Sequence, residues 1–426
     1  MHFCTRGDVM TGAALWFWVA CAGPGGDDSG QGGDSSDGTE TGIDVVDDTG
    51  VPPDDTGGTD TDTGEVDTGP DDDLVYAAFF DAAEVQRIDL EISEEGLAAL
   101  RADPDTYVEG VFLHDGYRLE GVGVKLKGGN STFEDIDGKP SLKVRLDAFD
   151  DDQDYGGLSR VNLHNMKADP SQAREVVASA VWTAAGLPAP LANYAEVYVN
   201  GVLYGLYANV EELDESFVER RWADPEGDLW EANNDADLTP GGILNYSSSA
   251  GEGDLDALDA ARREIQTGDG PFYDVANGVL DMPQFLDFWA WQIVLGNEDG
   301  YPYDLDDHSL YANPEDSGRL AYVPWALDET WDDGFDWESV TGTVAVHCAY
   351  DDACLVTLKE HVVAALTTYE GLDVNARTQA AIDLTVSAVQ ADTRRTLPLS
   401  DVLAARAALL SDVTARANVV RGQMGL

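Results

Sequence analysis

An acidic stretch late in the chain carries residue types that could do chemistry. Residues 296–330, "GNEDGYPYDLDDHSLYANPEDSGRLAYVPWALDET", place Asp299, the pair Asp306 and Asp307, and Asp328 among aromatic residues and a Pro-Trp pair. Carboxylates in such a pattern could form a solvated loop, hold calcium, or supply magnesium ligands and a base for phosphate transfer. The acids by themselves leave these alternatives open.

A group of lysines forms a second candidate. The chain has only 24 Lys and Arg residues against 82 Asp and Glu, yet Lys125, Lys127, Lys139 and Lys143 all fall within "KLKGGNSTFEDIDGKPSLK". The Gly-Gly-Asn segment 128–130 could let backbone amides approach an anion. The enrichment indicates an anion site, and the alternative is that the alternating charges are the solvated face of two strands.

Other candidates have simpler explanations. His164, one of six histidines, lies in a strand-like segment, which favours a structural hydrogen bond over a role as a base. The aromatic residues of 285–291 have helical spacing and are predicted to be core. The sequence contains no nucleophile elbow, P-loop or His-Glu-x-x-His motif. Its scattered acids offer no pair with the signature of a glycosidase.

Strands dominate the first half of the predicted domain. Alternating hydrophobicity predicts strands near 86–93, within 107–131 and at 139–149, and Asn200-Gly201 predicts a hairpin turn. A helix is expected over 171–187, capped by Ser171 and ended by Gly186 and Pro188.

The second half has the apolar spacing of helices. Helices are predicted at 215–222, 254–266, 282–297 and 355–372, followed by a C-terminal pair from 373 to 424. Strands followed by helices predict an α+β chain with two lobes in series and a ligand cleft between them.

Seven motifs in order carry a family resemblance. "VGVKLKGGNSTF", "GKPSLKVRL", "RVNLHNMKADPSQARE", "AAGLPAP", "VYVNGVLYGLYANVEELD", "GNEDGY" and "VPWALDETW" resemble the CotH family of spore-coat kinase-like proteins, over roughly residues 80–426. The resemblance implies an atypical protein-kinase-like fold with ATP and magnesium (or manganese) as cofactors. It also implies phosphate transfer to Ser or Thr of a protein substrate.

The resemblance assigns roles on the nucleotide side of the site. Lys143 first, Lys127 second and Lys125 beside them are expected to contact the phosphates of ATP. Glu211, in "YANVEELD", is expected to hold a lysine toward the nucleotide, as kinases generally arrange. Its neighbour Glu212 is expected to be solvated.

It also assigns roles to the acids. Asp299 matches the catalytic acid of the family, and Asp306, Asp307 and Asp328 are expected to hold the metal. Many relatives read Pro-Trp-Asp-x-Asp, whereas this chain has Ala326 at the first acid, which resembles a subgroup with a PWGxD-type motif. The alternative to an active kinase is therefore a pseudokinase that serves as a structural or interaction module at the cell surface.

Composition limits the class of partner. The formal net charge is −58, which argues against nucleic acid because binding its phosphates needs clustered Lys and Arg. At 43% hydrophobic residues the chain can bury a large core. Self-repulsion of the acidic domain is expected to make it less stable at low salt.

The N-terminal part predicts export. Residues 1–21 read as a signal peptide with a lipobox, "WVACAG", that would lipidate Cys21 and anchor the protein in a membrane at the cell envelope or surface. An ordinary cleaved signal is the alternative. Residues 22–73 read as a disordered acidic linker, and 74–426 as the kinase-like domain. In an exported protein, Cys348 and Cys354 are expected to form a disulfide.

Overall fold

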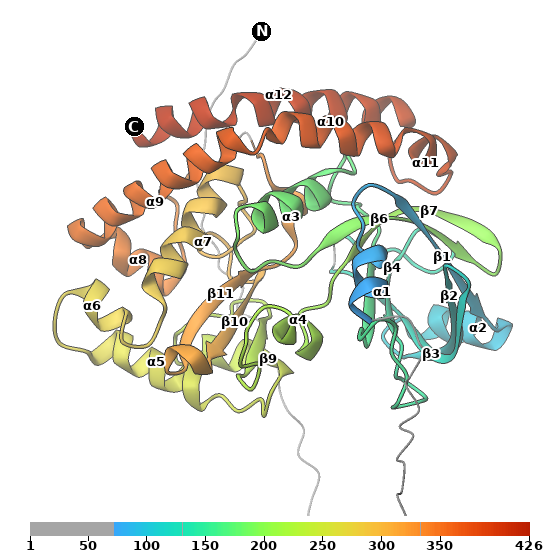
Figure 1. Ribbon diagram of the computed structural model, residues 1–426, viewed down its shortest axis with the longest axis horizontal. Coiled ribbons are helices and arrows are strands. Elements are labelled where there is room, and N and C mark those ends of the chain that lie inside the picture. Colours follow the sequence, from blue (N-terminus) through green and yellow to red (C-terminus); the bar gives the residue numbers. More distant parts are fainter. Residues whose placement is uncertain (1–71, 130, 333) are drawn as a thin grey trace, which may run out of the picture. The chain divides into compact units, whose positions relative to one another are not determined.

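The computed structural model describes residues 72–129, 131–332 and 334–426. The predicted signal peptide, Cys21 and the linker up to residue 71 lie outside the described residues. In the part described, sheet dominates the N-terminal half and helices dominate the C-terminal half (Figure 1). The predicted α+β class is confirmed.

The first half is a closed barrel with strand order β1-β2-β3-β4-β5-β7-β6. The strands are β1 (Val85–Ile92), β2 (Val108–His114), β3 (Tyr117–Lys127), β4 (Ser141–Arg145), β5 (Arg160–His164), β6 (Ala192–Val199) and β7 (Val202–Val210). Along β3, Val124 and Leu126 are fully buried in the barrel core. Because side chains alternate along a strand, Lys125 and Lys127 project from the outer face.

Turn and cap chemistry explains two local features of this half. Asn200 and Gly201 both have positive φ (50° and 76°) and join β6 to β7, which confirms the predicted hairpin. Helix α3 (Arg174–Ala184) has a different cap from the predicted Ser171. The carboxylate of Asp169 accepts from the N–H groups of Ala173 and Arg174 at 2.6 and 2.8 Å, and Ser171 donates to the same carboxylate.

The second half carries a four-stranded sheet, ordered β11-β10-β8-β9, of which the sequence indicated only the strand that ends at Leu310-Tyr311. The strands are β8 (Leu229–Ala232), β9 (Tyr246–Ala250), β10 (His308–Asn313) and β11 (Arg319–Pro324). Helix α7 (Met282–Leu295) packs on this sheet: Phe285 and Phe288 contact Tyr322 of β11 with ring centroids 5.0 and 5.4 Å apart. The prediction that its aromatic residues are core is confirmed, because Phe285, Phe288, Trp289 and Trp291 are at most 4% exposed.

Helices surround these two sheets. They are α1 (Asp72–Phe79), α2 (Glu94–Ala102), α4 (Glu215–Glu219), α5 (Asp256–Thr267), α6 (Phe272–Ala276), α8 (Thr343–Ala349), α9 (Asp352–Gly371), α10 (Val374–Leu384), α11 (Val386–Ala391) and α12 (Leu399–Met424). The predicted C-terminal pair is three helices. Helix α11 ends at Ala391, and α12 starts only after Pro398, which has no N–H to continue a helix. Helices α10 and α12 run side by side (Figure 1).

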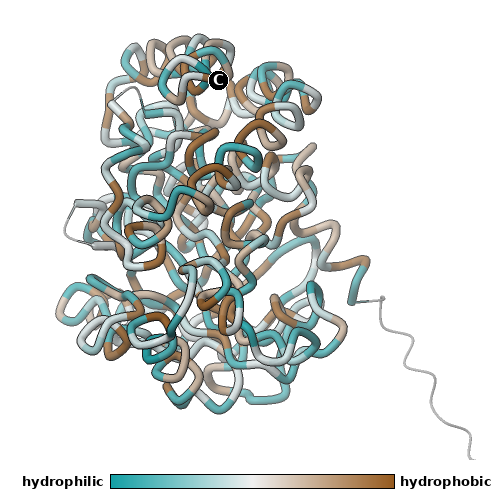
Figure 2. Tube along the Cα trace, turned by 90° about the vertical axis from the view of Figure 1, so that its left-hand side faces the viewer, coloured by the Kyte–Doolittle hydropathy of each residue, from teal (hydrophilic) through white to brown (hydrophobic). Residues whose placement is uncertain are grey.

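A disulfide and the hydropathy of the helices complete the description. Cys348 and Cys354 are fully buried and bonded to each other, as predicted. Hydrophobic and hydrophilic stretches alternate along the helices (Figure 2). Among the described residues, no helix is both long and apolar enough to cross a membrane.

Candidate active site

A cleft of about 310 Å³ brings residues of both halves together. The barrel contributes Lys127 and His164, from the ends of β3 and β5, and the glycine loop that follows β3. The second half contributes acids from two loops, one between α7 and β10 and one after β11. The predicted site residues that line the cleft are Lys127, Asp299, Asp306, Asp307 and Asp328.

The glycine loop turns back on itself directly after Lys127. Gly128 has φ 126°, and a Cβ there would lie 3.2 Å from the backbone of Phe133, so a larger residue would be strained and crowded. Thr132 and Phe133 donate their N–H groups to the carbonyl of Gly129 at 3.1 and 2.8 Å. This closed turn keeps the loop beside the cleft.

The acids lie in loops and turns where a helix or a strand ends or begins. Helix α7 ends at Leu295 and is capped by Gly296 in the left-handed conformation (φ 65°), and Asp299 follows in the loop. Asp307 directly precedes β10. Asp328 lies in the short 3-10 turn Leu327–Glu329 after β11, and the residue before this turn, Ala326, is also left-handed (φ 43°).

The acids of the cleft raise one another's pKa values. Burial, followed by repulsion from Glu329 and Asp304, raises the pKa of Asp299 to about 6. Burial and then the charge of Asp328 raise the pKa of Asp307 well above its ordinary value. The pKa of Asp328 is also raised well above its ordinary value, first by burial and then by the charge of Glu175. The site holds more negative charge than its protein surroundings compensate.

These residues fit a divalent cation whose remaining ligands come from elsewhere. No described residue donates a hydrogen bond to the side chains of Asp299 and Asp307, so their oxygens are available. Over the described ranges, however, no three His, Cys, Asp or Glu side chains are gathered closely enough to hold a metal by themselves. Magnesium usually takes one or two carboxylates and completes its shell with water and substrate phosphates, so this arrangement suits it.

Lys127 faces these acids from the barrel with uncharged partners. Its ammonium group donates to Oδ1 of Asn162 at 3.3 Å, lies 3.0 Å from Nε2 of His164, and lies 5.2 Å from the ring centre of Trp325. Burial lowers its pKa. No described carboxylate lies within ion-pair distance of Lys127, so its charge is available to an anion in the cleft.

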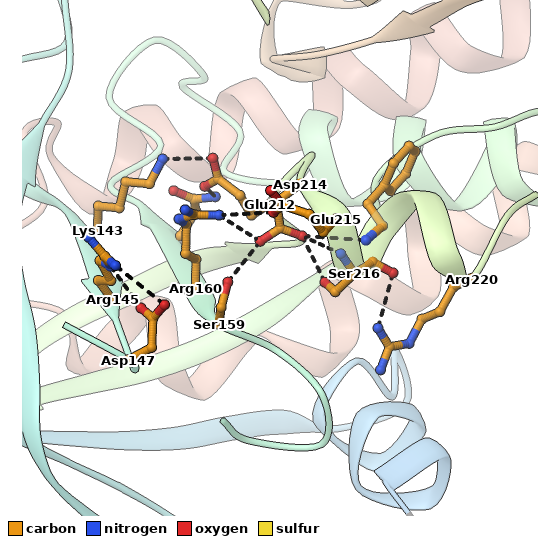
Figure 3. Close-up of polar contacts among 12 residues, drawn as sticks. Lys143, Arg145, Asp147, Ser159, Arg160, Glu212, Asp214, Glu215, Ser216 and Arg220 are labelled. Atoms are coloured by element: carbon orange, nitrogen blue, oxygen red, sulfur yellow. Dashed lines mark hydrogen bonds and ion pairs between the residues drawn. The ribbon is translucent and has the colours of Figure 1, made fainter. Parts of the chain in front are cut away.

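Lys143 is different, because its charge is already paired (Figure 3). Its ammonium group lies 2.6 Å from Oε1 of Glu212, and Asn162 donates to the other oxygen of Glu212 at 2.6 Å. Burial alone would raise the pKa of Glu212, but Lys143 and Lys127 outweigh burial and lower it. Lys143 does not line the cleft.

The prediction that Glu211 holds a lysine is wrong, as is the prediction that Glu212 is solvated. Glu211 accepts hydrogen bonds from Tyr76 of α1 and from Arg221, at 2.6 and 3.0 Å. It is 1% exposed, and Glu212 is only 9% exposed. Adjacent residues in an extended segment point in opposite directions, so only one of the two could reach Lys143. The sequence motif did not distinguish them.

The other two lysines of the predicted cluster lie elsewhere. Lys125 lies over the ring of Tyr107, 5.4 Å from its centre, and does not line the cleft. Lys139 is 2% exposed and forms a 2.7 Å ion pair with the fully buried Asp392, which follows α11. This pair ties the C-terminal helices to the barrel.

His164 also lines the cleft, although its strand-like sequence context favoured a purely structural role. Nδ1 lies 2.9 and 3.0 Å from the two oxygens of Glu175 in α3, and Nε2 faces Lys127. The predicted structural hydrogen-bonding role agrees with these contacts. Its position beside a candidate phosphate lysine depends on the barrel, which brings β3 and β5 to either side of β4.

Two known proteins are similar in sequence to part of this chain. Inner spore coat protein H of Bacillus subtilis is 23% identical over 189 residues, 42% of this chain and 51% of that protein. Invasin CotH3 of Rhizopus delemar is 22% identical over 214 residues, 46% of this chain and 35% of that protein. The chain thus spans about half, or less, of the length of these relatives.

The chain is also similar to a solved structure and to a protein family. The HipA, HipB and operator DNA complex of Shewanella oneidensis gives a TM-score of 0.34 at 14% identity, covering 79% of this chain and 74% of that chain, which is too low to support an argument. The CotH kinase protein family matches residues 124–356, which is more than half of the chain and includes every residue that lines the cleft. The chain belongs to the CotH kinase protein family.

Proposed function

We propose that this protein is an ATP- and magnesium-dependent kinase that phosphorylates Ser or Thr residues of proteins at a cell surface or coat. The observation that carries the proposal is that Lys127, which has no carboxylate partner among the described residues, lines the same cleft as Asp299, Asp307 and Asp328. Phosphate transfer needs a cation for the nucleotide's phosphates, carboxylates for the metal and an acid that orients the acceptor hydroxyl. The cleft contains a candidate for each.

Lys127 is the better candidate for the phosphate contact than Lys143. An anion that approaches Lys143 must compete with Glu212, whose carboxylate is already at 2.6 Å. Within the part of the chain that the structure describes, the partners of Lys127 at hydrogen-bonding distance are uncharged, and Lys127 lies in the wall of the cleft. Lys143 and Glu212 then act as a supporting pair, linked to Lys127 through Asn162, and Lys125 contributes only long-range charge.

The aspartates divide the remaining roles. Asp299, with a pKa near 6, is largely ionised at neutral pH yet basic enough to take the proton of an acceptor hydroxyl. Asp307 and Asp328 are the metal ligands in this proposal, with Asp306, which also lines the cleft, as a further candidate. Bound magnesium (or manganese) supplies positive charge to the phosphates.

The test is a calorimetric titration of the full chain with ATP, with magnesium, with manganese and without metal. Asp328→Asn should weaken metal-dependent binding by at least about tenfold, because a metal ligand is lost. The matched control is Asp269→Asn, an exposed aspartate outside the cleft, which should bind like the wild type. Binding by wild type that is unaffected by Asp328→Asn would remove Asp328 from the site.

A second candidate function is a pseudokinase that acts as a surface interaction module. Ala326 favours this candidate. It lines the cleft at the position where the resemblance to the family implies an acidic residue in many relatives, and an alanine side chain cannot bind a metal. Absence of ATP binding by the wild type in every metal condition would select this candidate.

Location and subgroup complete the proposal. The names of the two relatives, a spore coat protein and an invasin, support a coat or surface location. We place the protein in the exported class, anchored through a lipidated Cys21, and in the subgroup with a PWGxD-type motif. Radiolabelled palmitate incorporation, lost in Cys21→Ser, tests the anchor.

A further inference from the structure

A series of polar contacts links Lys127 in the cleft wall to His164 and then to Glu175. Lys127 is held between Asn162 and His164, and His164 is in turn held by Glu175. Glu175 is 4% exposed and projects from α3, whereas the other residues lie on barrel strands. The contacts therefore tie a helix outside the barrel to the lysine that faces the cleft.

The tautomer of His164 follows from the contacts of its two ring nitrogens. An ammonium group has only donors, so Nε2 of His164 must present its lone pair to Lys127. The neutral imidazole then carries its proton on Nδ1, where the two oxygens of Glu175 accept it at 2.9 and 3.0 Å. Because Lys127 occupies the lone pair of Nε2, His164 is not available as a base for the acceptor hydroxyl.

The ring of Trp325 fixes the same arrangement from a third side. It stands edge-on to His164, with ring centroids 5.8 Å apart, and lies 5.2 Å from the ammonium group of Lys127. Aromatic and imidazole contacts of this kind restrain the lysine without neutralising it. A carboxylate in either place would compete with an anionic ligand for Lys127.

We propose that His164 and Glu175 are a positioning pair, which holds Lys127 in place as a charged, unneutralised contact for the phosphates of a nucleotide. The proposal rests on the proposed function for the identity of the ligand. Its geometric part, that the lone pair on Nε2 of His164 stabilises the ammonium form of Lys127, can be tested without nucleotide.

The test uses two substitutions of His164 that differ in reach. An Asn amide extends about as far as Nδ1, so His164→Asn keeps a group near Glu175 and loses the acceptor for Lys127. A Gln amide extends about as far as Nε2, so His164→Gln keeps an acceptor. Both are polar and of similar size, and thermal melting of each variant verifies its fold.

The first readout is acylation of lysines by acetic anhydride, followed by peptide mass spectrometry. Loss of a hydrogen bond to the ammonium form increases the neutral amine fraction, so Lys127 should react about fivefold faster in His164→Asn at pH 8. His164→Gln should react like the wild type. Lys359, which lies on α9 away from the cleft, is the internal reference. Equal Lys127 rates in wild type and His164→Asn would overturn the proposal.

The second readout is the separation of KM for ATP from kcat. His164→Asn should raise KM about tenfold with a smaller change in kcat, and His164→Gln should restore KM to within about threefold of wild type. Glu175→Ala should repeat the effect, and Glu175→Gln, which retains an acceptor for Nδ1–H, should restore it. Equal KM values in His164→Asn and His164→Gln would overturn the positioning role.

The two readouts separate the two proposals. Faster acylation of Lys127 in a protein that binds no ATP would support the positioning pair and reject the kinase function. Metal-dependent ATP binding with unchanged acylation would support the kinase function and reject the pair.

Discussion

The ammonium group of Lys143 lies 2.6 Å from a carboxylate oxygen of Glu212, whereas Glu211, the residue before it, is bound to Arg221 and Tyr76. Two adjacent glutamates thus bind partners in different parts of the structure. Glu212 belongs to the polar chain behind the cleft, and Glu211 attaches α1 and the segment after α4 to the barrel.

Substitution of the two glutamates should therefore separate stability from activity. Glu211→Ala leaves the half-buried Arg221 without its carboxylate partner and removes the acceptor for Tyr76, so we expect the free energy of unfolding to fall by about 3 kcal/mol. Chemical denaturation checks this value. The expected effect on KM for ATP is small, because Glu211 does not line the cleft.

Glu212→Gln should have the opposite profile. Glutamine keeps the hydrogen bond from Asn162 and the side-chain volume but loses the charge that pairs with Lys143. We expect a loss of kcat/KM of at least about tenfold, because the supporting pair behind Lys127 is broken. A steady-state assay in which both variants lose activity equally would contradict this division of roles.

Protonation of Asp299 should set the lower limit of the pH range of activity. The carboxylate is the active form, so kcat/KM should rise with pH and level off above a pKa of about 6. The measurement is a pH profile of phosphate transfer between pH 5 and pH 8, and Asp299→Asn should abolish activity across it. A profile that is flat between pH 5 and pH 7 would contradict the assignment.

The raised pKa of Asp299 should also make the free energy of unfolding depend on pH, with lower stability at higher pH. Folding favours its protonated form, so its contribution is fully present below the ordinary Asp pKa of about 4 and is lost as the pH rises through about 6. Asp299→Asn removes the repulsion and should melt at a higher temperature than wild type at pH 7.5. The difference should disappear near pH 4, as differential scanning calorimetry can show.

Ala326 offers a gain-of-function test of the metal site. Aspartate tolerates the left-handed conformation of this position better than most residues, and its carboxylate would add a ligand to the cleft. Ala326→Asp should tighten magnesium-dependent ATP binding about tenfold in a calorimetric titration. Ala326→Gly is the control, because it relieves the backbone and should add up to about 1 kcal/mol of stability without adding a ligand. Equal ATP binding by both variants would contradict a metal site at this turn.

Salt should stabilise the protein. Acidic residues outnumber basic ones by 82 to 24, and cleft acids such as Asp307 repel one another. Screening shortens the range of that repulsion from about 30 Å at 0.01 M to about 3 Å at 1 M salt. The melting temperature should therefore rise as potassium chloride is added, and a constant melting temperature would contradict the expectation.

Local patterns of the sequence determined much of the fold. Alternation along 117–127 and 192–210 defined strands, Asn200-Gly201 defined their turn, and the apolar spacing of α7 defined a buried helix, because each signal acts within a few residues. The cap of α3 was less predictable, since Asp169 and Ser171 are both possible cap residues at its start. The break between α11 and α12 was also missed, although Pro398 marks the start of α12. Most of the second sheet was missed because its short strands lie among helices.

Only the tertiary structure decided which of the predicted site residues meet. The sequence indicated Lys125, Lys127, Lys139 and Lys143 alike, and the barrel sends them to Tyr107, the cleft, Asp392 and Glu212 respectively. Strand alternation limits a lysine to one face, but its partner across the sheet or from a helix comes from distant parts of the chain. The same holds for His164, whose neighbours Lys127 and Glu175 are 37 and 11 residues away in sequence and are brought to either side of its ring by folding.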